Sequence, residues 1–151
     1  MKLESLVGSA RKIALLFVPF LLAGGAFNVF YPERFAIGGP SPTLGGISVV
    51  VLIAGLVNWA WSVSLLLTKA KRNELIRTGP YAVTKHPLYT GMALLVLPWL
   101  GFLLNSWLGV VLGLVLYVAS RIYAPLEEKK LAEAFGRQWE TYLQKVWLPW
   151  L

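Results

Sequence analysis

The polar, basic stretch from Gly79 to Tyr89 contains the only histidine of the chain, His86, directly before Pro87. Proline suits the first turn of a helix, because the N–H that it lacks would be unpaired there. The residue before a proline is pushed toward extended geometry, so we expect His86 to cap an apolar helix. The positive end of that helix favours an anion such as a carboxylate or phosphate. A histidine that only caps the helix fits these residues equally well.

A second polar group, Arg121 with the neighbouring acids Glu127 and Glu128, follows about forty residues later at the end of another apolar segment. Adjacent residues on a helix point about 100° apart, so the two acids are not expected to share a proton. They could contact two different groups of one ligand. The alternatives are an arginine that extends to the membrane surface and two solvated acids in a first helical turn.

The composition indicates that both groups sit at the edge of a membrane. Hydrophobic residues make up 57% of the 151 residues, charged residues only 14%, and the mean hydropathy is +0.64. There are no cysteines, so disulfides, thiolate metal sites and a cysteine nucleophile are excluded, and one histidine argues against a metal centre. The net charge of +7 comes from basic residues beside apolar segments, which favours lipid headgroups over nucleic acid as partners.

The apolar segments predict an all-α, polytopic membrane protein made of one domain, residues 1–151. A membrane-spanning helix needs about 20 apolar residues, within a range of roughly 17–25. Four segments qualify: 13–30, 44–67, 88–104 and 107–124. Only Asn105 and Ser106 separate the last two, so we expect a tight antiparallel hairpin.

Charge placement predicts the orientation of the spans. Basic residues concentrate at the N-terminus (Lys2, Arg11, Lys12), between Lys69 and Lys85, and in the C-terminal tail, whereas the opposite loops are nearly neutral. The positive-inside rule therefore predicts cytoplasmic termini in an inner or plasma membrane, with both polar groups on the cytoplasmic side. The first span, with its basic start and small residues near 23–26, also resembles a secretory signal peptide.

The segment 126–146 is predicted to be an amphipathic helix at the cytoplasmic interface. Apolar residues recur there at three- and four-residue steps, with charged residues on the other face. Trp147 and Trp150 fit an aromatic belt at the same level. A membrane-anchoring tail and a functional lid both fit this pattern.

Taken together, an anion-binding helix start and a pair of acids lie on one membrane side, as a zwitterionic, nucleotide-like cofactor requires. Gly79-Pro80-Tyr81, then Lys85-His86-Pro87-Leu88-Tyr89 and Gly91, resembles the GPY…RHPxYxG signature of the isoprenylcysteine carboxyl methyltransferase and phospholipid methyltransferase superfamily. Further downstream, the superfamily's C-terminal pattern is similar to Arg121, Glu127-Glu128, Phe135-Gly136, Tyr142 and Val146. The resemblance covers residues 75–149.

The resemblance implies an integral-membrane methyltransferase that binds S-adenosylmethionine at the cytoplasmic ends of the last spans, releases S-adenosylhomocysteine, and takes a lipophilic acceptor from the bilayer. It implies cofactor contacts for His86, Tyr89 and Glu128. Tyr81, Lys85, Pro87 and Leu88 belong to the same cofactor site, and Gly91 allows close approach. Catalytic roles, orienting cofactor or acceptor, fall to Arg121 and Glu127. Lys85 stands where the family usually has arginine, so a planar bidentate contact is lost there.

The acceptor stays open between a prenylcysteine-like carboxylate, a phospholipid amine and a small lipophilic thiol. An amine must first lose a proton, for which Glu127 or His86 is the candidate base. Two other functions also fit parts of the sequence. A non-enzymatic membrane assembly or anchoring protein would use small residues such as Gly109 and Gly113 for helix packing. A reductase-like relative would use a nicotinamide cofactor, but the sequence has no dinucleotide-binding glycine fingerprint.

Overall fold

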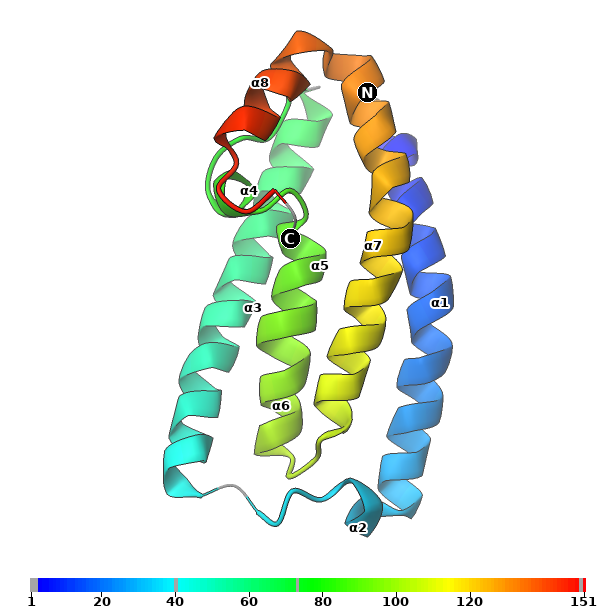
Figure 1. The fold of residues 1–151 in the computed structure, drawn as a ribbon, viewed down its shortest axis with the longest axis vertical. Coiled ribbons are helices and arrows are strands. Elements are labelled where there is room, and N and C mark those ends of the chain that lie inside the picture. Colours follow the sequence, from blue (N-terminus) through cyan, green and yellow to red (C-terminus); the bar gives the residue numbers. More distant parts are fainter. Residues whose placement is uncertain (1–2, 40, 73, 150) are drawn as a thin grey trace.

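The computed structural model describes residues 3–39, 41–72, 74–149 and 151, and it shows an elongated bundle of helices (Figure 1). Lys2 and Trp150 lie outside the described residues. The long helices are α1 (Leu3–Phe30), α3 (Pro42–Lys71) and α7 (Leu108–Phe135). The shorter elements are α2 (Pro32–Phe35), α4 (Pro80–Val83), α5 (Pro87–Gly91), the π-helical segment η1 (Met92–Val96), α6 (Leu97–Leu103) and α8 (Arg137–Lys145).

The predicted all-α membrane fold is confirmed. Within the described residues, three helices are long and apolar enough to cross a membrane: Ser9–Phe30, Pro42–Lys69 and Leu108–Phe135. The predicted third span corresponds to α5, η1 and α6, which form a shorter apolar helix over Pro87–Leu103. At 1.5 Å per residue this helix is about 25 Å long, somewhat less than the roughly 30 Å hydrocarbon core. The protein is therefore an integral membrane protein with one short span.

Pro98 explains the π-helical turn in that short span. It has no N–H to donate to the carbonyl group four residues earlier, which disturbs the helical ladder just before it. The residues before it form the π-helical segment η1, Met92–Val96, whose turns are wider than those of an α-helix.

The spans lie side by side in the order α3, α5–α6, α7, α1 (Figure 1). Glycines make the contacts between neighbouring helices close. A Cβ on Gly109 or Gly113 of α7 would collide with the carbonyl oxygens of Leu97 and Ala93, and one on Gly55 of α3 would lie 2.8 Å from the Leu95 Cβ. Small residues at such points let backbones approach within a membrane. Gly109 and Gly113, the small residues proposed for helix packing in an assembly protein, thus pack against helices of the same chain.

The predicted hairpin between the last two spans is confirmed, and it is tied to the loop between the first two. Asn105 turns the chain with a positive φ of 54°. Its Oδ1 accepts hydrogen bonds from the backbone N–H groups of Gly39 (2.7 Å) and Ile37 (3.3 Å). The Trp107 N–H donates to the Phe35 carbonyl oxygen at 2.9 Å. These bonds close the end of the bundle opposite to α8 (Figure 1).

The predicted boundary between the fourth span (107–124) and the interfacial helix (126–146) was wrong. Helix α7 continues through Pro125 to Phe135, and the break comes at Gly136, whose φ is 46°. Proline at position 125 removes only one backbone hydrogen bond. The helix continues without that bond, near the end of the span. The left-handed backbone at Gly136, by contrast, ends the helix.

The apolar face of the C-terminal segment packs within the protein. Trp139, Tyr142 and Val146 form a buried cluster against Leu75, Leu131, Phe135 and Leu143. Helix α8 thus folds back over the bundle end, whereas the side chain of Trp147 is exposed. Of the two predicted roles, this arrangement favours a lid.

The contact between α6 and α7 can be tested with Gly109→Ala. We expect a lower midpoint of thermal unfolding, corresponding to about 1–3 kcal/mol, because the added Cβ overpacks the contact with Leu97 and Gly101. The matched control is Gly46→Ala, also in a helix but with no atom within 4 Å of the added Cβ. Tryptophan fluorescence in detergent measures both. Equal midpoints would contradict the close packing of these helices.

Candidate active site

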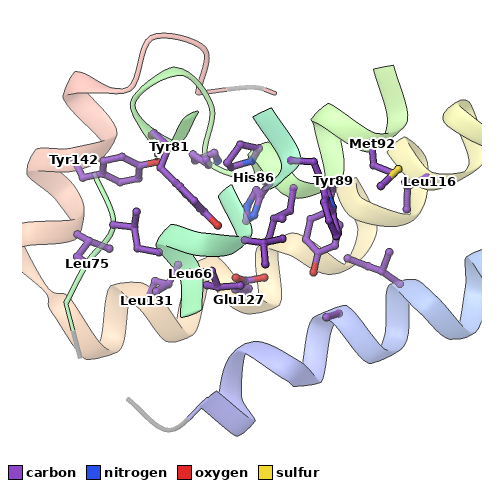
Figure 2. Close-up of a pocket in the computed structure, with 18 of the residues that line it drawn as sticks. Leu66, Leu75, Tyr81, His86, Tyr89, Met92, Leu116, Glu127, Leu131 and Tyr142 are labelled. Atoms are coloured by element: carbon purple, nitrogen blue, oxygen red, sulfur yellow. Dashed lines mark hydrogen bonds between the residues drawn. The ribbon is translucent and has the colours of Figure 1, made fainter. Parts of the chain in front are cut away.

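The Gly79-Pro80-Tyr81 motif turns the chain at the bundle end that carries α8. Gly79 has φ 64° and ψ −137°, a conformation that side chains strongly disfavour, and it precedes α4. A Cβ there would also lie 3.0 Å from the Trp61 ring. Pro80 then starts α4, where its missing N–H costs nothing. The motif thereby directs the Tyr81 side chain toward the inside of the bundle (Figure 2).

His86 occupies the predicted position before α5, but its ring does not cap the helix. Pro87 begins α5, and the His86 side chain makes no capping hydrogen bond. Its Nε2 lies 3.0 Å from Oε1 of Glu128 on α7. The hydroxyl of Thr90 instead donates to the His86 carbonyl oxygen at 3.0 Å. The imidazole is therefore held by a long-range contact, with a ring face available to a neighbouring cavity.

Glu128 joins the loop to α7 through two basic side chains. Lys85 Nζ donates to the same Oε1 at 2.7 Å. The side chains of Lys85, His86 and Glu128 are only 12%, 9% and 25% exposed. Charges so far from water are stable only when they are paired, so each of these groups depends on the others. The cluster fixes His86 relative to α7.

The two adjacent acids point into different spaces, as their 100° separation predicts. Glu127 lines a large cavity of about 470 Å³, and Glu128 lines a second cavity of about 180 Å³. The carboxylate of Glu127 accepts a hydrogen bond from the Ser9 hydroxyl of α1 at 3.0 Å. Lys85 and His86 border both cavities, so the Glu128 cluster forms the partition between them.

Most of the sequence-predicted site residues line the large cavity. They are Tyr81, Lys85, His86, Pro87, Leu88, Tyr89 and Glu127. Figure 2 shows the rings of Tyr81, His86 and Tyr89 directed toward the same region as the Glu127 carboxylate. The volume of this cavity falls in the range of 300–1,000 Å³ that is usual for small-molecule sites.

Three predicted residues do not line the large cavity: Glu128, which borders the small one, Arg121 and Gly91. Arg121 is exposed and borders the small cavity, on the face of α7 that also carries Glu128. Gly91 borders neither cavity; an added Cβ would lie 2.6 Å from Nδ2 of Asn58 on α3. The close approach that Gly91 allows is thus between two helices, and the expected approach to a ligand has no counterpart here.

The other side of the large cavity comes from helices in which sequence reasoning found no site residue. Helix α1 contributes Ala10, Ile13, Ala14 and Phe17, and α3 contributes Trp59, Val63 and Leu66. These side chains are apolar, like most of their neighbours in each span, so nothing in the sequence marks them. The hydroxyl of Ser9 lies close to this part of the chain, but nothing in the sequence connects it with Glu127.

Helix α8 covers the polar end of the cavity. The Tyr142 hydroxyl donates to the Tyr81 carbonyl oxygen at 2.7 Å. The backbone N–H groups of Trp147 and Leu148 donate to the carbonyl oxygens of Ala82 and Val83. Burial raises the pKa of both Tyr81 and Tyr142, so their phenols stay neutral hydrogen-bond donors at neutral pH. In the described part of the chain, no group of acids or histidines is arranged to hold a metal ion.

Comparisons with known proteins agree with this arrangement. The family model described as "Phospholipid methyltransferase" matches residues 33–138. Two rice proteins (Oryza sativa subsp. indica and subsp. japonica), each named "Probable protein-S-isoprenylcysteine O-methyltransferase", are 35% identical over 75 residues. Those residues are 50% of this chain and 39% of each relative, so the chain aligns with less than half the length of these proteins. No solved structure matches.

The ion pair between Lys85 and Glu128, which separates the two cavities, can be tested by a double-mutant cycle. Lys85→Gln and Glu128→Gln should each lower the free energy of unfolding by about 1–3 kcal/mol, because each leaves a poorly hydrated partner unpaired. The double variant should lose less than the sum, as neither charge then remains. Denaturant titrations in detergent measure the cycle, with the exposed Glu133→Gln as control. Strict additivity would mean that the pair is not coupled.

Proposed function

The chain belongs to the phospholipid methyltransferase family, and from this membership we propose that it transfers the methyl group of S-adenosylmethionine to a lipophilic acceptor. The observation that carries this proposal is the convergence of the predicted motif residues on one cavity with a polar end and an apolar remainder. The positive-inside rule predicts that the polar end faces the cytoplasm, where a soluble methyl donor is available.

The residues of the large cavity fit S-adenosylmethionine by charge and shape. This donor carries a carboxylate, an ammonium, a sulfonium and an aromatic base. Lys85 offers a positive charge and His86 a hydrogen-bonding ring nitrogen to the carboxylate, and Glu127 offers a carboxylate to a cationic group. The rings of Tyr81, Tyr89 and Trp139 offer surfaces for the aromatic base. The site therefore contains a partner for each part of the donor.

The apolar part of the cavity suits an acceptor with a hydrocarbon body. Its lining from α1 and α3 is made of aliphatic and aromatic side chains. These helices are the outermost of the row (Figure 1). They also carry exposed apolar residues, such as Phe20 and Val57, that fit a lipid environment. An acceptor that partitions into the bilayer would reach the cavity along these spans.

The proposed catalysis is mainly positioning and exclusion of water. Bound S-adenosylmethionine supplies an activated methyl group, so the protein has to hold donor and acceptor in line. His86, fixed by Glu128, and Tyr81, fixed through the backbone contact of Tyr142, are positioned for that task. Helix α8 above them limits access of water to the reacting groups.

The alternative functions have less support. A membrane assembly protein would need its small residues on a free surface. Gly109 and Gly113 instead pack against other helices of the same chain. A nicotinamide-dependent reductase would not account for the family match over residues 33–138.

Binding of S-adenosylhomocysteine to the purified protein in nanodiscs tests the proposal. We expect saturable binding by isothermal titration calorimetry, weakened about tenfold or more by His86→Ala because a charge-assisted contact is lost. Lys12→Ala, an exposed basic residue of α1 away from both cavities, should bind like the wild type. A wild-type protein that does not bind, or a His86→Ala variant of unchanged affinity, would contradict the proposal.

A further inference from the structure

Helix α1 closes one side of the large cavity, although it lies outside residues 33–138, the region that the family model matches. The α1 residues that line the cavity have apolar side chains, which offer a ligand neither charge nor a hydrogen bond: Ala10, Ile13, Ala14 and Phe17. Ser9, at the same end of the helix, makes a polar contact with a charged residue of the cavity. This contact links α1 to the charged part of the site.

The contact joins Ser9 to Glu127 of α7. The buried Ser9 hydroxyl donates to Oε2 of Glu127 at 3.0 Å. A glutamate side chain has several rotatable bonds, and Lys130, three residues further along α7, is a neighbour on the helix surface that could draw the carboxylate away. The bond from Ser9 restricts this freedom. Figure 2 shows the Glu127 carboxylate directed toward the same region as the rings of Tyr81 and Tyr89.

The bond fixes the direction of the Glu127 carboxylate without cancelling its charge. A serine hydroxyl is neutral, whereas the Lys85 ammonium that pairs with Glu128 at 2.7 Å is positively charged. The two oxygens of a carboxylate also offer about four acceptor positions, so one bond from Ser9 leaves others for a ligand. A carboxylate held in one direction in a largely apolar cavity attracts a positively charged group.

Helix α1 does not need this hydrogen bond to stay against α7. Ile13, one turn after Ser9, belongs to a buried cluster that includes Leu116 of α7. At the opposite end of α1, the Ser106 hydroxyl donates to Oδ1 of Asn28 at 2.8 Å. Because α1 is attached along its length, the bond from Ser9 mainly determines where the Glu127 carboxylate lies.

We propose that Ser9 is a positioning residue of the site, whose hydroxyl holds the Glu127 carboxylate toward a cationic group of the methyl donor. This inference rests on the proposed methyltransferase function. Ser9 lines neither cavity, so it acts through Glu127 and not by contact with the ligand. Helix α1 thereby contributes to donor binding from outside the region that the family model matches.

Two variants of the same shape test the hydroxyl. Ser9→Thr keeps it, and Ser9→Val has a methyl group in its place. S-adenosylhomocysteine, whose ammonium group is cationic, is titrated into each variant in nanodiscs by isothermal titration calorimetry. We expect Ser9→Val to bind at least about threefold more weakly than Ser9→Thr, because Glu127 is no longer held in place. Ser9→Ala, which removes the hydroxyl without adding volume, should show a similar loss relative to the wild type.

Asn28→Ala is the control for attachment of α1. It removes the hydrogen bond with Ser106 at the other end of the same helix, away from both cavities. We expect a lower midpoint of thermal unfolding, measured by tryptophan fluorescence, with unchanged affinity for S-adenosylhomocysteine. This result would separate the attachment of the helix from the positioning of Glu127.

A double-mutant cycle tests whether Ser9 acts through Glu127. Glu127→Ala removes the carboxylate and should itself weaken the binding of S-adenosylhomocysteine. In that background we expect Ser9→Val to cause no further loss, because no carboxylate remains to be held. An equal loss from Ser9→Val with and without Glu127 would overturn the inference.

The outcomes separate this inference from the proposed function. If the wild type binds S-adenosylhomocysteine and Ser9→Val binds as tightly as Ser9→Thr, the inference is overturned while the donor site stands. The same holds if Asn28→Ala loses as much affinity as Ser9→Val. If the wild type does not bind S-adenosylhomocysteine, both the inference and the proposed function are overturned.

Discussion

The organisation of this protein depends on one ionic cluster at the edge of the membrane, in which Glu128 pairs with both Lys85 and His86. The loop between α3 and α5 has little regular structure, so few of its own backbone hydrogen bonds can hold it in place. The cluster fastens this loop to α7 and separates two cavities with different chemistry. Because none of the three side chains is well hydrated, the pairing also fixes the direction in which the imidazole faces.

Close packing of the short span against α3 and α7 makes that cluster possible. Glycines at 55, 109 and 113 bring α3 and α7 close to the short span, so its polar start lies next to the end of α7. The π-helical turn before Pro98 belongs to the same arrangement, because it lets the short span continue past a missing hydrogen bond. Helix α8 then closes the polar end through its buried face of Trp139, Tyr142 and Val146.

Sequence reasoning predicted the parts of this design that rest on local patterns. Long apolar runs predicted the spans, Pro87 predicted the start of α5, and the spacing of Glu127 and Glu128 predicted two different directions. It failed at Pro125, where a proline did not end the helix, because tertiary packing of Leu131 and Phe135 outweighed a local preference. It also missed the contribution of α1 and α3, since an apolar residue that faces a cavity and one that faces lipid look alike in sequence. Only three-dimensional packing shows that Gly91 is opposite Asn58 and that Arg121 borders a separate cavity.

The central claim, that a methyl donor binds in the large cavity beneath α8, predicts where backbone motion changes on binding. Hydrogen–deuterium exchange of the protein in nanodiscs, with and without S-adenosylhomocysteine, measures this directly. We predict slower exchange in residues 79–91 and 137–146, and no change in residues 31–39 at the opposite end of the bundle. Unchanged exchange around the cavity at saturating ligand, or protection confined to the opposite end, would contradict the account.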